Sequence, residues 1–141
     1  MATVTKSVLV PHSAERMFEL VDRVERYPEF LPWCPATKLI ERTGEITRAR
    51  IDVDYHGLTT HFTTRNTKDA PRSMDIALEE GPFERLEGRW TFTPLGDEGT
   101  RVELRVDYEL ASRSVSRVLA PVFGHILETL VDGFVARADE T

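Results

Sequence analysis

The side chains that could do chemistry in this chain are few, and no spacing brings them together. The single cysteine, Cys34, has no histidine or aspartate nearby in the sequence to activate it as a nucleophile. The histidines do not show the spacing of a metal-binding pair. The Gly-x-Ser-x-Gly, Gly-x-Gly-x-x-Gly and P-loop motifs are also absent. We therefore predict no catalytic residues, no metal site and no nucleotide cofactor.

Three polar side chains are predicted to point into the interior instead. Asn66 continues the alternating apolar positions that include Phe62, and Tyr55 and Tyr108 share the apolar side of their own strands. A buried amide or phenol needs a hydrogen-bond partner, so in an apolar cavity these groups suit the polar end of a ligand. Asp52 does not share this side of its strand, so no acid–base pair is expected inside.

The segment Tyr27-Pro28-Glu29-Phe30-Leu31-Pro32-Trp33-Cys34 is unusual because it is both irregular and apolar. Its two prolines exclude a regular helix or a central strand, although a short helical turn is possible over residues 25–27. An aromatic loop must pack inward, line a cavity or contact an apolar partner. It could be a fixed plug over a full core or a gate over a cavity, and Trp33 is the residue most expected to contact a ligand or a membrane.

The elements that must position these residues follow from periodicity. Apolar residues alternate with polar ones in seven segments, over residues 3–10, 37–43, 48–55, 58–65, 74–78, 86–92 and 101–110. After a plausible N-cap at Ser13, a helix of two to three turns buries a face that includes Phe18. A long amphipathic helix is predicted from Ser114 to Ala138, with a kink at Pro121.

These elements predict an α+β fold in which a curved antiparallel sheet of six to seven strands wraps around the long C-terminal helix. The apolar face of such a sheet is larger than one helix can cover, which leaves room for a cavity of about 300–1,000 Å³. Gly124 and Gly133 in the helix suggest close packing or room for a ligand, with helix curvature as the alternative. The candidate ligand-binding residues are Phe18, Tyr27, Phe30, Leu31, Trp33, Tyr55, Phe62, Asn66, Trp90, Tyr108, Val122, Phe123, Ile126 and Leu130.

Composition sets limits on the class of protein. A chain of 141 residues with 40% hydrophobic and 30% charged residues is expected to fold as one domain, residues 1–141. A net charge of −6 argues against DNA binding and against a broad nucleic-acid surface, although a local basic patch remains compatible with it. One cysteine and no signal-peptide pattern indicate the cytoplasm. The most apolar stretch, residues 118–127, is too short to span a bilayer, so any membrane contact would be peripheral.

Four stretches together resemble the START-like (SRPBCC) superfamily, in its coenzyme Q-binding and polyketide cyclase-like branch. They cover nearly the whole chain. These stretches are residues 21–34 with the Tyr-Pro-Glu-Phe-Leu-Pro-Trp-Cys run, Thr64-Arg65-Asn66, residues 81–90 with Gly-Pro-Phe-Glu-Arg-Leu-Glu-Gly-Arg-Trp, and residues 121–138. The same branch includes the ribosome association toxin RatA of bacteria.

The resemblance implies a helix-grip fold that binds ubiquinone or a similar isoprenoid lipid and supports respiration as a carrier or chaperone. The lipid would be a ligand and not a cofactor, and the protein could act at the inner membrane. His125 would then be a candidate to hydrogen-bond a quinone carbonyl. Two alternatives follow from the same resemblance. One is a toxin that binds the ribosome and blocks subunit joining, which the acidic charge disfavours, and the other is a polyketide cyclase or dehydratase.

Overall fold

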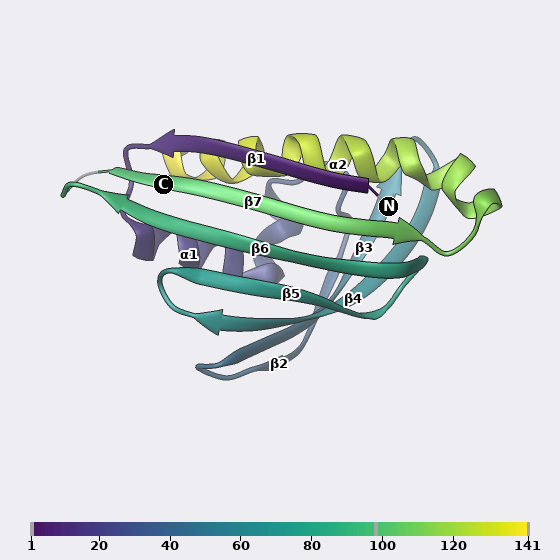
Figure 1. Cartoon of the computed structure of the whole chain (residues 1–141), viewed down its shortest axis with the longest axis horizontal. Coiled ribbons are helices and arrows are strands. Elements are labelled where there is room, and N and C mark those ends of the chain that lie inside the picture. The colour runs from purple at the N-terminus through teal and green to yellow at the C-terminus, as the bar shows by residue number, and fades with distance from the viewer. Residues whose placement is uncertain (1, 98, 141) are drawn as a thin grey trace.

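A computed structural model describes residues 2–97 and 99–140 and shows one antiparallel sheet of seven strands against a long helix (Figure 1). The strand order is β1-β7-β6-β5-β4-β3-β2, so every chain neighbour from β2 to β7 is also a sheet neighbour. The strands are β1 (Ala2–Val10), β2 (Thr37–Arg42), β3 (Ile46–Tyr55), β4 (Leu58–Asp69), β5 (Ser73–Glu80), β6 (Phe83–Leu95) and β7 (Gly99–Leu110). The predicted helix-grip architecture is confirmed.

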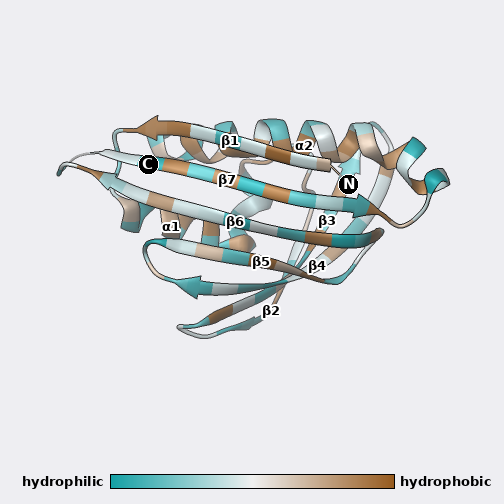
Figure 2. Ribbon diagram, viewed as in Figure 1, coloured by the Kyte–Doolittle hydropathy of each residue, from teal (hydrophilic) through white to brown (hydrophobic). Residues whose placement is uncertain are grey.

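Alternation of apolar and charged residues gives the sheet one buried and one exposed face. In β7, Val102, Leu104 and Val106 are buried while the residues between them are exposed. Figure 2 shows this alternation as brown and teal bands along the strands. The antiparallel register places Trp90 of β6 opposite Leu104 of β7, so inward side chains from neighbouring strands share one core. The exposed face carries ion pairs such as Asp75 with Arg89.

Helix α1 (Ala14–Asp22) and the 3₁₀ helix η1 (Val24–Glu29) connect β1 to β2. The predicted N-cap is confirmed, because the Ser13 hydroxyl accepts a hydrogen bond of 3.1 Å from the Arg16 backbone N–H. The short turn expected over residues 25–27 is longer than predicted and continues past Pro28. A proline is compatible with this because a 3₁₀ turn has few internal hydrogen bonds to lose.

Helix α2 (Arg113–Glu140) lies along the concave side of the sheet. It runs through Pro121 without ending, and its first turns bend away from the axis of the rest in Figure 1, as a proline inside a helix favours. Its length and composition would suffice to cross a membrane, which residues 118–127 alone did not suggest. The core helix of a folded domain passes the same test, and α2 buries Phe123, Ile126 and Phe134.

A group of charged side chains ties the two short helices to the edge of the sheet. Asp22, at the end of α1, accepts hydrogen bonds from the Thr47 hydroxyl at 2.6 Å and from the Lys68 ammonium at 3.1 Å. Arg42 of β2 donates two hydrogen bonds to the carboxylate of Glu25, at 2.7 and 2.8 Å, and one to the Asp22 carbonyl at 2.7 Å. Because Lys68 is nearly buried, its contact with Asp22 anchors the segment that leads into the aromatic loop.

Candidate ligand-binding cavity

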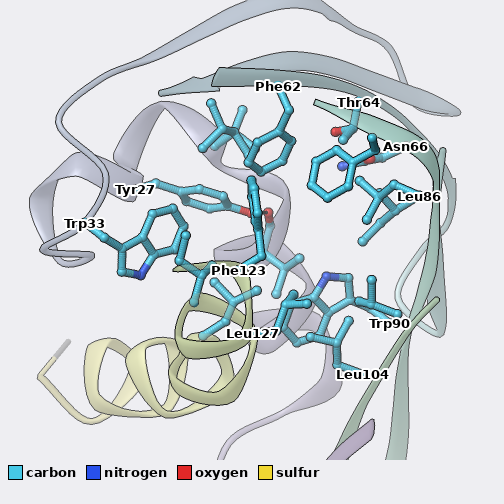
Figure 3. Close-up of a pocket in the computed structure, with 18 residues that line it drawn as sticks. Tyr27, Trp33, Phe62, Thr64, Asn66, Leu86, Trp90, Leu104, Phe123 and Leu127 are labelled. Carbon is cyan, nitrogen blue, oxygen red and sulfur yellow. Dashed lines mark hydrogen bonds between the residues drawn. The ribbon is translucent and has the colours of Figure 1, made fainter. Parts of the chain in front are cut away.

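An internal cavity of about 90 Å³ lies between the sheet and α2 (Figure 3). Its walls are almost entirely apolar and come from α1, η1, the aromatic loop, the inner face of the sheet and α2. The lining residues are Val21, Val24, Tyr27, Trp33, Ile51, Phe62, Thr64, Asn66, Ile76, Phe83, Leu86, Trp90, Leu104, Val106, Phe123, Ile126, Leu127 and Leu130.

Sequence periodicity identified a large part of this lining. Among the predicted ligand-binding residues, the structure brings together around the cavity Tyr27, Trp33, Phe62, Asn66, Trp90, Phe123, Ile126 and Leu130. They come from four elements (η1, β4, β6 and α2) and one loop, and Figure 3 shows the labelled ones converging on the same space. For the six residues on β4, β6 and α2, the alternation of strands and the 3.6-residue period of the helix were sufficient to select the inward faces.

Three other candidates near the aromatic loop do not line the cavity. Phe18 is buried on the inner face of α1, where its ring packs edge-on against Phe92 at 5.6 Å. Leu31 packs against the backbone of α2 at Gly133. Phe30 faces outward and contributes to a surface groove instead. In an irregular loop there is no period to tell which side chain points inward, so aromatic character alone selected too many residues.

The remaining three candidates also lie outside the cavity lining. Tyr55 is half-exposed and packs beside His125, with ring centroids 4.9 Å apart. Tyr108 is buried against Phe83, and Val122 is buried in α2 without lining the cavity. The prediction that Tyr55 and Tyr108 reach the cavity is wrong, because inward parity gives the side of a strand and not the position along it. His125 is exposed and also lies outside the lining.

Asn66 is the main polar residue in the lining of the cavity. Its side chain is 7% exposed, and its Oδ1 has no hydrogen-bond partner among the described residues. It lies on β4 opposite Ile76 of β5, and Thr64, two residues earlier on the same side of β4, also lines the cavity. An unpaired buried amide oxygen costs about 1–3 kcal/mol of stability, so its retention in an apolar enclosure points to a partner that arrives from outside the chain.

Three phenylalanine rings, from β4, β6 and α2, close one side of the cavity. Phe83 and Phe123 lie 4.6 Å apart between ring centroids, and Phe62 lies 5.9 Å from Phe123. Phe83 was not predicted as a site residue, although its place directly after Gly81-Pro82 and three residues before Leu86 could have indicated the start of a buried strand. The other residues missed are mostly aliphatic, and strand parity marked them only as core.

The expected cavity volume of about 300–1,000 Å³ is wrong, because the observed cavity is about 90 Å³. The rings of Phe62, Phe83 and Phe123 occupy the surplus space that the sheet was expected to leave open. An apolar cavity of about 150 Å³ is known to hold a benzene ring, so the observed cavity is smaller than one that accepts a single ring. A quinone therefore fits only if side chains around the cavity move.

The aromatic loop is held firmly at several points, as a plug would be. The Tyr27 hydroxyl donates a hydrogen bond to the Val21 carbonyl, and the Asp54 N–H donates to the Trp33 carbonyl at 2.9 Å. Burial raises the pKa of Tyr27 well above its usual range, so its hydroxyl keeps its proton. Leu127 and Leu130 of α2 are half-buried and also line the cavity.

The lining offers little for acid–base chemistry. Among the described residues that form it, Tyr27 is the only titratable one, and its proton is already engaged. Cys34 is buried beside the cavity wall, and burial raises the pKa of its thiol to about 11, so it is a poor nucleophile at neutral pH. Within residues 2–97 and 99–140, no three acidic, histidine or cysteine side chains are grouped to hold a metal ion.

Comparison with known sequences gives the chain its relatives. Residues 10–135 match the sequence model of the family described as polyketide cyclase / dehydrase and lipid transport. The ribosome association toxin RatA of Escherichia coli is 37% identical over 99% of this chain and 89% of its own length. RatA of Pseudomonas aeruginosa is 38% identical over 97% of this chain and 95% of its own. The mitochondrial coenzyme Q-binding protein coq10 of Schizosaccharomyces pombe is 28% identical over 94% of this chain and 84% of its own.

Solved structures agree with this assignment. A START superfamily protein from Mycobacterium smegmatis superposes with a TM-score of 0.81 and 25% identity, covering 98% of this chain and 97% of the other. The Zhui aromatase/cyclase from Streptomyces sp. R1128 superposes with a TM-score of 0.86 over 98% of this chain and 93% of its own, but at 19% identity it supports the fold alone. The chain therefore belongs to the polyketide cyclase / dehydrase and lipid transport family, within the START-like superfamily.

Proposed function

We propose that this protein binds a quinone-like isoprenoid lipid between the sheet and α2, as a carrier or chaperone and not as an enzyme. The observation that carries the proposal is the Oδ1 of Asn66, which has no partner among the described residues and lies in an almost entirely apolar cavity. The amide of Asn66 can accept from a hydroxyl or donate to a carbonyl, which are the polar groups of a reduced or oxidised quinone ring. The name of the coq10 relative supports this ligand class.

The small size of the cavity makes binding an opening process. Each isoprene unit buries about four to five carbons, which contribute about 3–4 kcal/mol at about 0.8 kcal/mol for each buried CH₂ group. Displacing a well-packed ring such as Phe123 costs about 1–3 kcal/mol, by analogy with overpacked cores. The tail therefore supplies enough free energy to hold the cavity open, whereas a bare quinone ring has much less to offer.

A binding titration with a quinone that carries an isoprenoid tail tests the proposal. Trp33 and Trp90 both line the cavity, so their fluorescence is expected to change when a quinone enters. The variant Asn66→Leu should weaken binding of the ring while leaving tail burial intact, and Arg85→Gln on the outer face of the sheet is a neutral control. Absence of any fluorescence change, together with absence of isoprenoid lipid in mass spectra of the purified protein, would refute the proposal.

A second candidate function is association with the large ribosomal subunit. It is favoured by the relatives named RatA, which match at 37–38% identity over nearly the whole chain. The surface gives it less support. The net charge is −6, and several arginines on the outer face of the sheet are already paired, as in Arg48 with Glu79 at 2.7 Å. Sedimentation of a cell extract through a sucrose gradient at low salt tests it, because the protein must then travel with the large subunit.

A cyclase or dehydratase activity has no such observation in its favour. The family description and the Zhui structure show that enzymes share this fold. The described cavity lining, however, has no carboxylate or histidine to serve as general acid or base.

We place the protein in the cytoplasm as a proposal, with peripheral contact at the inner membrane where an isoprenoid lipid would be exchanged.

A further inference from the structure

A second concave surface lies outside the cavity, where α1, η1 and the last turns of α2 meet. This groove has a volume of about 370 Å³. Its lining residues are Leu20, Arg23, Arg26, Phe30 and Arg137, and we call it the arginine groove. Three guanidinium groups surround two half-buried apolar side chains, and none of the lining residues is acidic. Such a local concentration of positive charge is unusual in a chain of net charge −6.

The carboxylates next to the arginine groove balance its charge only in part. Glu29 is shared, because it accepts from Arg26 at 2.8 Å with one oxygen and from Arg137 at 2.6 Å with the other. Both contacts lower the pKa of Glu29 below its usual range. Arg23, the residue that follows α1, pairs with Glu19 of α1. The side chains of Arg23 and Arg26 are 53% and 57% exposed, so further donors of these two residues face solvent.

The arginine groove and the cavity are two sides of one aromatic wall. The Phe30 ring lies 5.4 Å from that of Phe134 and 6.1 Å from that of Tyr27, and Tyr27 lines the cavity. On the outer side, the Arg137 guanidinium lies over the Phe30 ring at 5.2 Å. The groove is therefore next to the loop that covers the proposed lipid site, about one layer of side chains away.

We propose that the arginine groove docks the protein on a membrane by binding phosphate groups of anionic phospholipids, with Phe30 and Leu20 against the acyl boundary. This proposal rests on the proposed lipid-binding function, because docking would bring the wall of the cavity to the membrane that holds its ligand. Arginine recognises phosphate through paired N–H donors, and an apolar floor between arginines suits a lipid better than a bare anion.

A nucleic acid is the competing partner for a basic and aromatic surface, and the structure favours the membrane. Only three arginines line the groove, whereas binding along an RNA strand needs a longer track of positive charge. Glu19, which pairs with Arg23, also places a negative charge beside the groove. A lipid headgroup needs only one or two phosphate contacts, which the groove can provide.

Flotation with lipid vesicles tests the docking proposal. Vesicles of phosphatidylcholine alone are compared with vesicles that also contain phosphatidylglycerol, and neither contains quinone. The double variant Arg23→Gln/Arg26→Gln removes the two most exposed guanidiniums. A basic residue at an anionic surface contributes about 1 kcal/mol, a factor of about five in the partition coefficient, so the double variant should partition about 25-fold less. The matched control is Arg85→Gln, whose side chain is 55% exposed and pairs with Glu87 at 2.8 Å.

The expected result is binding to the anionic vesicles only, lost in the double variant and kept in the control. Absence of binding by the unchanged protein, or equal binding by the double variant, would overturn the proposal. Binding of single-stranded RNA without vesicle binding, if lost in the same double variant, would assign the arginine groove to nucleic acid instead. Quinone titration in detergent solution measures the cavity separately, so failure of membrane docking and failure of lipid binding give different results.

Discussion

Leu31 of the aromatic loop packs directly onto the backbone of α2 at Gly133. A Cβ atom added to Gly133 would lie 2.7 Å from Leu31 Cδ2, closer than real Cβ contacts allow. Leu31 is 2% exposed, so its side chain has little free space into which to move. This contact explains one of the two helix glycines that the sequence marked as unusual. At Gly124, by contrast, no atom lies within 4 Å of an added Cβ.

The two glycines therefore predict opposite effects of alanine. Gly124→Ala should raise the free energy of unfolding by about 1 kcal/mol, because alanine favours a helix over glycine. Gly133→Ala gains the same propensity but overpacks Leu31, which costs about 1–3 kcal/mol, so it should be clearly less stable than Gly124→Ala. Urea unfolding of both variants measures the difference. Equal stability of the two would show that the loop moves away from α2 without cost.

Asn66 predicts a trade-off between stability and binding. Replacing it by leucine removes the unpaired buried amide oxygen, and the free energy of unfolding should rise by up to about 1–3 kcal/mol. The same change removes the polar contact proposed for the quinone ring, so affinity should fall while stability increases. Urea unfolding and quinone titration on one preparation measure both effects. A loss of stability in Asn66→Leu would mean that the amide already has a partner in the folded protein.

The sheet and α2 could be predicted closely from the sequence because each has its own period. Strand β7 reads as alternating apolar and charged residues from Arg101 to Leu110, and the structure gives Gly99–Leu110. The helix predicted over residues 114–138 runs from Arg113 to Glu140. The prolines were weaker guides to the limits of the helices, because Pro28 does not prevent a 3₁₀ helix and Pro121 does not end α2.

The site was less predictable because a cavity depends on position along the elements and on packing. Parity placed Tyr108 and Phe62 on the same inward side, yet only Phe62 reaches the cavity. The volume depended on how three rings from distant strands and α2 meet, and no local pattern encodes such a contact. The arginine groove was equally hidden, because Arg23 and Arg137 are far apart in the chain and meet only through the fold.

Phe123 is predicted to limit the rate at which a ligand enters. Its ring fills the cavity side between Phe62 and Phe83, so Phe123→Ala should enlarge the cavity and lower stability by about 3–5 kcal/mol. Quinone association, followed by stopped-flow tryptophan fluorescence, should become faster. Phe18→Ala is the matched control, since this equally buried ring packs on Phe92 outside the lining. The same acceleration in both variants would indicate general loosening and not a gate.

The contact between Glu25 and Arg42 predicts a defined pH dependence. The bidentate hydrogen bond from Arg42 lowers the pKa of Glu25 from 4.5 to about 2. A carboxylate with a lowered folded-state pKa stabilises the fold above pH 4.5 and loses this contribution as the pH falls from 4.5 to 2. Because both side chains are partly exposed, solvent screening limits the effect to less than about 1 kcal/mol.

Glu25→Gln should therefore lower the free energy of unfolding at pH 7 by less than about 1 kcal/mol, and this difference from the unchanged protein should vanish near pH 2. Urea unfolding at a series of pH values between 7 and 2 provides the comparison. Glu87→Gln is a suitable control, because its ion pair with Arg85 lies within one strand and joins no two elements. Parallel stability curves for Glu25→Gln and the unchanged protein between pH 4.5 and 2 would show that Arg42 does not hold η1 to the sheet through this charge.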